Sequence, residues 1–134
     1  MAGCVPYPVY KTLQPASTAT VRDEQGRPVA DAAVTLVSSA YPYGREKSRE
    51  TQLTLPDGVA AFAARREWRT EVLALHGWEE YFWNWCVQKE GFATYRTRYG
   101  AAADFPTDVN VVLRAGESQP CAAGLSADQP GSPR

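Results

Sequence analysis

The stretch Tyr81-Phe82-Trp83-Asn84-Trp85-Cys86-Val87-Gln88 decides the fold of this chain. It is the most aromatic run in the sequence, and its side chains alternate with a period of two, which is typical of a β-strand. The face that should point to the core carries Tyr81, Trp83, Trp85 and Val87. The opposite, more polar face carries Phe82, Asn84, Cys86 and Gln88. Since buried indole rings cover much apolar area, we expect this stretch to be the central strand of a small domain.

The composition predicts one ordinary globular domain. The chain has 134 residues, of which 44% are hydrophobic and 22% charged, and its net charge is −1. Cations and anions are mixed along the sequence, so no strong field favours a nucleic-acid partner. The single histidine, His76, and the absence of a Cys-x-x-Cys pair argue against a structural metal site. We expect a monomer without a cofactor.

Other alternating runs, bounded by glycine, proline and acidic residues, predict further strands. They span 18–23, 32–38, 52–55, 59–63, 93–99 and 108–114. The segment 40–47 reads as a polar loop, and Pro56-Asp57-Gly58 predicts a hairpin turn. Together these signals indicate an all-β protein.

The segment between residues 65 and 80 fits two patterns. Trp68, Val72 and Leu75 fall on one helical face, which predicts a short helix over residues 66–76. An irregular segment with a strand at residues 71–74 is the alternative.

One spacing resembles a known family. The order Val21-x-Asp23-x-x-Gly26-x-Pro28-Val29-x-x-Ala32-x-Val34-x-Leu36, followed by Asp57-Gly58-x-x-x-Phe62, is similar to the carboxypeptidase regulatory-like domain. The resemblance continues at Val87-x-x-x-Gly91-Phe92 and in the last strand, and it covers residues 18–114. It implies a seven-stranded, two-sheet sandwich of the transthyretin-like (prealbumin-like, Ig-like) class. Related domains act as accessory modules of peptidases, transporters and envelope complexes.

The resemblance leaves two flanking segments. Residues 1–17 contain several prolines, which predict an extended tether or the lead-in to an edge strand. Residues 115–134 are rich in Gly, Ser, Pro and Ala, and we expect them to be disordered beyond about Cys121.

Cys4 follows Ala2-Gly3 and resembles the end of a bacterial lipobox, in which the cysteine carries a lipid. The resemblance implies a lipoprotein anchored in the membrane through Cys4. Val5 is not the aspartate associated with inner-membrane retention, so we expect the periplasmic face of the outer membrane. The alternative is an ordinary thiol near the terminus.

Cys86 and Cys121 are the pair expected to form a disulfide in an oxidising periplasm. The alternative is two free thiols, one of them buried.

Catalysis is not expected, because neither a Gly-x-Ser-x-Gly elbow nor a histidine cluster is present. Hydroxyisourate hydrolases of the transthyretin-like family use several histidines and a Tyr-Arg-Gly-Ser terminus, and this chain lacks both. The sequence therefore favours a non-enzymatic cell-envelope domain for binding or assembly, with an envelope protein or glycan as its partner. The alternatives are a carbohydrate-binding module and, third, an uncharacterised hydrolase. The aromatic residues that could form an exposed binding patch are Tyr41, Tyr43, Trp78, Tyr95 and Tyr99.

Overall fold

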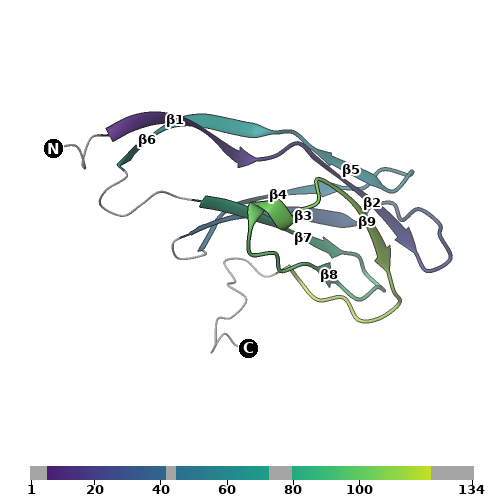
Figure 1. The fold of residues 1–134 in the computed structure, drawn as a ribbon. Coiled ribbons are helices and arrows are strands. Elements are labelled where there is room, and N and C mark those ends of the chain that lie inside the picture. The colour runs from purple at the N-terminus through teal and green to yellow at the C-terminus, as the bar shows by residue number, and fades with distance from the viewer. Residues whose placement is uncertain (1–5, 42–44, 73–79, 122–134) are drawn as a thin grey trace, which may run out of the picture.

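The computed structural model describes residues 6–41, 45–72 and 80–121, and these form an all-β protein (Figure 1). The strands are β1 (Pro6–Gln14), β2 (Ser17–Asp23), β3 (Ala33–Tyr41), β4 (Arg45–Leu53), β5 (Val59–Phe62), β6 (Arg65–Val72), β7 (Glu80–Gln88), β8 (Tyr95–Arg96) and β9 (Asp108–Leu113). One turn of 3-10 helix, η1 (Ala102–Asp104), precedes β9, and the described residues contain no α-helix.

The strands form three small sheets. Their orders are β4-β3-β7-β8, β5-β2-β9 and β1-β6. Strands β2 and β9 run parallel, whereas the other pairs of strands are antiparallel. The predicted all-β class is confirmed, but the described residues hold nine strands in three sheets rather than seven strands in two.

The aromatic stretch is strand β7, and the predicted alternation of its inward face is confirmed. Trp85 is 1% exposed and Val87 is 0% exposed, and both belong to the main hydrophobic cluster with Tyr81 and Trp83. The ring of Phe105 stacks on Trp85 with centroids 5.3 Å apart. Residues of β2, β5 and β9 belong to the same cluster, so one core joins the three-stranded and four-stranded sheets. The outward face is also shielded, because Phe82 and Cys86 are buried.

The side chain of Asp23, the last residue of β2, shapes the turn that follows this strand. The Asp23 carboxylate accepts hydrogen bonds from the backbone N–H groups of Gln25 and Arg27, both at 2.9 Å. Gly26 has a φ of +83°, which glycine adopts without steric cost. The hydrogen bond from the Arg27 N–H is the main cause that lowers the pKa of Asp23 below its usual value. The Gln25 N–H lowers this pKa further, while desolvation opposes both by raising it. Local chemistry therefore sets this turn, as the spacing predicted.

Three local predictions need correction. The segment 66–76 is not helical where it is described, because β6 (Arg65–Val72) is a strand paired with β1. The turn at residues 56–58 does not close a hairpin, since β4 and β5 belong to different sheets. Strands β3 and β4 also extend into the predicted loop 40–47, whose residues 42–44 lie outside the described residues.

Strands β1 and β6 prolong the β2–β5 pair beyond the core. Ser17 faces Phe62 in one sheet and Gln14 faces Arg65 in the next, so the antiparallel register continues across the break. The two-stranded sheet projects past the end of the four-stranded sheet (Figure 1). We call this two-stranded sheet the ribbon. The predicted lead-in at residues 6–14 is thus a paired strand.

Candidate functional site

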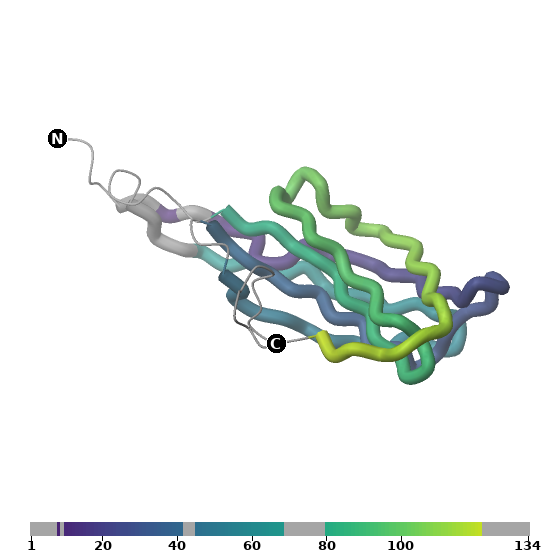
Figure 2. Tube along the Cα trace, turned by 90° about the horizontal axis from the view of Figure 1, so that it is seen from below, coloured from purple at the N-terminus to yellow at the C-terminus, as the bar shows by residue number. Residues whose placement is uncertain are grey.

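Cys86 and Cys121 form a disulfide, as predicted, and it joins β7 to the segment after β9. The two residues are 35 positions apart, and in the alternation of β7 Cys86 lies on the face opposite that of Trp85 and Val87. Figure 2 shows the segment after β9, in yellow, turning back toward the four-stranded sheet.

Residues 117–121, which we call the strap, cross the outer face of this sheet from β8 toward β4. Thr94 exchanges two hydrogen bonds with the backbone of Gln119, one of them 2.8 Å from the Gln119 nitrogen to Oγ1. The Arg96 guanidinium donates to the Pro120 carbonyl at 3.1 Å. The Cys121 N–H donates to the Gln88 side chain at 3.3 Å. The strap is therefore fixed by polar contacts along its length as well as by the Cys86–Cys121 disulfide.

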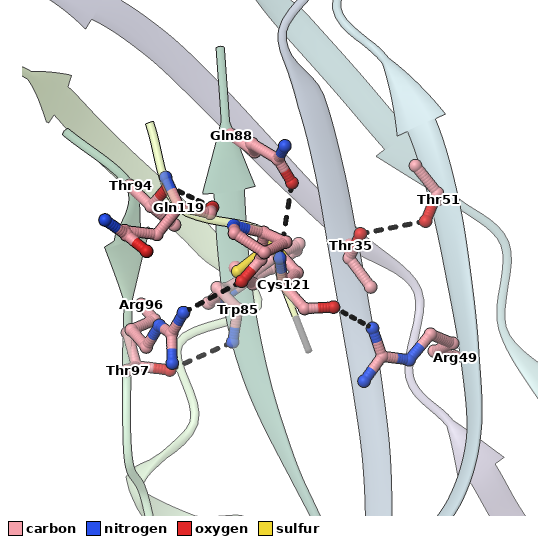
Figure 3. The surroundings of a disulfide bond; sticks show 12 residues. Thr35, Arg49, Thr51, Trp85, Gln88, Thr94, Arg96, Thr97, Gln119 and Cys121 are labelled. Carbon is pink, nitrogen blue, oxygen red and sulfur yellow. Dashed lines mark hydrogen bonds between the residues drawn. A yellow bond between two sulfur atoms is a disulfide. The ribbon is translucent and has the colours of Figure 1, made fainter. Parts of the chain in front are cut away.

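Arg49 of β4 holds the far end of the strap. It donates to the Cys121 carbonyl at 2.8 Å and to both carboxylate oxygens of Glu46, at 2.6 and 2.8 Å. The hydrogen bonds with Glu46 raise the pKa of Arg49 above its usual value. The guanidinium is half-buried in this position and links β4 to the end of the strap (Figure 3).

The described tyrosines of the predicted aromatic patch lie around the segment after β8 and make packing or hydrogen-bond contacts there, and Tyr41 is 40% exposed. Tyr95 and Tyr99 are half-buried and pack against the core. Burial, and after it the charge of Tyr99, raise the pKa of Tyr95. Tyr41 lies on the ring of Phe82, with centroids 4.7 Å apart, and its hydroxyl donates to the Gly100 carbonyl at 2.8 Å. None of the three is a fully exposed ring.

Asn84 organises the segment beside these tyrosines. Its amide donates to the Tyr99 carbonyl at 3.0 Å, and its carbonyl oxygen accepts from the Tyr99 N–H. The same oxygen accepts from the Thr97 hydroxyl at 2.8 Å, while the Trp85 N–H donates to that hydroxyl at 2.9 Å. One side chain on the outer face of β7 thus positions residues 97–99.

Among the side chains that the structure describes, the most exposed aromatic pair lies on the ribbon, and it was not part of the predicted aromatic patch. Trp68 is 68% exposed and Tyr10 is 57% exposed. They are cross-strand partners, and their ring centroids are 4.9 Å apart. Such a pair stabilises two strands by about 0.5–1.5 kcal/mol. The signal for it was the alternation of charged with uncharged residues in Glu67-Trp68-Arg69-Thr70-Glu71, which fits a strand.

The base of the ribbon is held to the four-stranded sheet by buried polar groups. The register shifts between Thr12 and Gln14, and the Leu13 carbonyl accepts hydrogen bonds from the Trp83 indole at 2.9 Å and the Ser38 hydroxyl at 3.1 Å. Gln14 is fully buried, and its amide donates to Glu50 at 2.8 Å. That hydrogen bond is the main cause that lowers the pKa of Glu50.

Several predicted residues lie outside the described part of the chain. They are Cys4, Tyr43, His76 and Trp78. Among the residues that the structure describes, no three His, Cys, Asp or Glu side chains are grouped so that they could hold a metal ion. In the same part of the chain, no helix has the length and apolar character needed to cross a bilayer. No protein-family model, curated protein or solved structure matches this chain.

Proposed function

We propose that this chain is an exported, non-enzymatic domain for binding or assembly in the bacterial cell envelope. In this proposal the domain is a transthyretin-like sandwich, held at the periplasmic face of the outer membrane by a lipid on Cys4. Its partner is another component of the envelope.

The observation that carries the proposal is the Cys86–Cys121 disulfide. Cytosolic thiols are kept reduced, whereas disulfides persist in the periplasm and outside the cell. Here the bond fastens the strap to the central strand, so it has a structural role rather than that of an exposed pair of thiols.

Two further features support it. The lipobox resemblance at Cys4 independently points to export. The turn at Asp23, Gly26 and Pro28, which carries the family resemblance, has the tight geometry that this spacing requires.

The test is the thiol state of the protein in its native host. Cells are treated with a membrane-permeant alkylating reagent before lysis, and the intact mass of the purified protein is measured with and without reduction. The proposal expects Cys86 and Cys121 to be protected until reduction, and a lipid mass on the peptide that contains Cys4. Alkylated Cys86 and Cys121, with no lipid on Cys4, would overturn it.

A Cys4→Ser variant is the matched control. It should lose the lipid and leave the membrane fraction while keeping the disulfide, so that anchoring and oxidation are measured separately.

A further inference from the structure

The ribbon has an unused strand edge. Within the described residues, β6 pairs with β1 on one side and has no strand on the other. Two strands alone form a marginal sheet in water, and an open edge is a template for another strand. The exposed pair Tyr10 and Trp68 lies on this ribbon.

The prolines of β1 show which main-chain groups of the ribbon face outward. Pro6 and Pro8 have no N–H, and they occupy alternate positions, so their nitrogens face the same side of β1. Proline is tolerated where that side points away from the neighbouring strand. The hydrogen-bonded positions of β1 are then residues 7, 9 and 11, which face residues 71, 69 and 67 of β6. The main-chain groups of Arg66, Trp68 and Thr70 therefore point to the open edge of β6.

The sequence of β6 is complementary to itself about Trp68. If two copies pair antiparallel with Trp68 opposite Trp68 of the second copy, position 67 faces position 69 and position 65 faces position 71. In sequence, each of these pairings places a glutamate opposite an arginine. The pairing of positions 67 and 69 lies nearest the axis, whereas Arg65 also donates to the side chains of Gln14 and Ser48, both at 3.3 Å. Centring the pair on Arg66 would place two arginines face to face. Centring it on Thr70 would leave residues 65–67 of β6 without a partner in the second copy of the strand.

The direction of the main-chain groups agrees with this register. A two-fold axis at Trp68 requires the N–H and C=O of that residue to face the open edge, as inferred above. The charged pairs then fall at non-hydrogen-bonded positions, where opposing Cα atoms are only about 4.5 Å apart and side chains are closest. Opposite charges at such cross-strand positions stabilise the pairing.

We propose that the ribbon is a dimerisation element, through which two copies of this chain join β6 to β6 in an antiparallel pair centred on Trp68. The strand order across the interface is β1-β6-β6-β1, which makes one continuous four-stranded sheet. The two Tyr10–Trp68 pairs then form a single row of four aromatic rings across one face. The interface has the self-complementary form of a two-fold dimer. This goes beyond the proposed function and beyond the monomer expected from the sequence.

The first experiment measures self-association of the full chain by sedimentation over a wide range of concentration. Arg69→Glu replaces an attraction by a repulsion at both ends of the interface, and in β1 position 69 faces only the uncharged Val9. We expect this variant to weaken the dimer at least tenfold. Glu67 faces Lys11 within the ribbon, so adding Glu67→Arg together with Lys11→Glu exchanges the charges across the interface, keeps opposite charges at positions 11 and 67, and should restore the dimer. Glu90→Arg, in an exposed turn, is the charge control and should leave association unchanged.

The second experiment tests the register in a Cys4→Ser background. Trp68→Cys places a thiol opposite its own copy, where the Cα separation of about 5.5 Å expected for a hydrogen-bonded pair suits a disulfide. Oxidation should yield a covalent dimer from Trp68→Cys. It should yield none from Thr70→Cys, which faces position 66 instead. This readout works even if a charge variant folds poorly.

Two results would overturn the proposal. One is a wild-type chain that remains monomeric at all concentrations, which would mean that the open edge of β6 does not bind a second copy of this chain. The other is a dimer that is indifferent to Arg69→Glu, or that cross-links through position 70 rather than position 68.

Discussion

Breaking the disulfide should remove much of the stability of the domain and release the strap. The bond closes a loop of 35 residues. On the chain-entropy model a loop of this length stabilises the folded state by about 4 kcal/mol, because the unfolded chain is restricted. That is a large share of the roughly 5–15 kcal/mol that holds a typical domain together. We therefore expect Cys121→Ser to lower the melting temperature by roughly 10–20 °C.

The assay compares oxidised wild type, reduced wild type and Cys121→Ser by denaturant unfolding, all in a Cys4→Ser background so that no third thiol can exchange. The reduced protein and the variant should coincide, because both lack the cross-link. Hydrogen exchange should accelerate at residues 117–121, where Gln119 and Cys121 donate their N–H groups to side chains of the sheet. Buried strands such as β3 should remain protected under native conditions.

Unchanged stability after reduction would refute this reasoning. It would mean that the polar contacts of the strap with Arg49, Gln88, Thr94 and Arg96 hold residues 117–121 without the covalent bond.

Three other substitutions test the polar contacts described above. Trp83→Phe removes one of the two donors to the Leu13 carbonyl, so it should cost about 1–2 kcal/mol in denaturant unfolding and speed hydrogen exchange in β1. Asn84→Ala removes three hydrogen bonds to residues 97–99 and should cost about 2–4 kcal/mol in the same assay. The Gln14 amide is the main cause of the lowered pKa of Glu50, so this carboxylate stabilises the fold above its ordinary pKa of 4.5 and loses that effect as the pH falls below it. Glu50→Gln should therefore lose less stability than wild type between pH 6 and pH 3, measured as urea midpoints.

Each of these predictions can fail separately. Unchanged exchange in β1 would show that the Trp83 indole does not hold the ribbon. If the free energy of unfolding of Asn84→Ala is within about 0.5 kcal/mol of wild type, contacts other than those of Asn84 hold residues 97–99 in place. Equal losses in acid for wild type and Glu50→Gln would assign the pH dependence to other carboxylates.

The sequence predicted the features that depend on local pattern. Trp85 and Val87 are buried because a period of two in an apolar strand leaves one face for the core. Cys86 bonds Cys121 as expected, and the turns at Gly26 and Gly58 form where glycine permits positive φ.

The ribbon was harder to predict because its signals conflict. Trp68 and Val72 are four residues apart and fit one helical face, while the charges between them alternate as in a strand, and pairing with β1 decides the outcome. Pro6 and Pro8 suggested a tether, since proline opposes a central strand, but an edge position accepts it. A turn at residues 56–58 was predicted correctly. The residues near it do not indicate that it connects strands of two different sheets.

The exposure of the predicted aromatic patch could not be read from the sequence. Exposure of an aromatic residue depends on what packs over it. Tyr99 belongs to the segment that Asn84 orders, and Tyr95 and Tyr99 both pack against the core. Trp68 is exposed because its strand stands beyond the core. Neither outcome follows from spacing along the chain.

The continuity of β1 with β2 also determines how the molecule would respond to mechanical load. A pull applied at residue 6 runs along β1 into β2, which is the middle strand of its sheet, flanked by β5 and β9. The hydrogen bonds to both neighbours would then resist together in shear, instead of opening one at a time as in a peeled edge strand. The pairing of β1 with β6 and the contacts of Leu13 with Trp83 and Ser38 lie between residue 6 and β2, so they would bear the load before the β2 hydrogen bonds do.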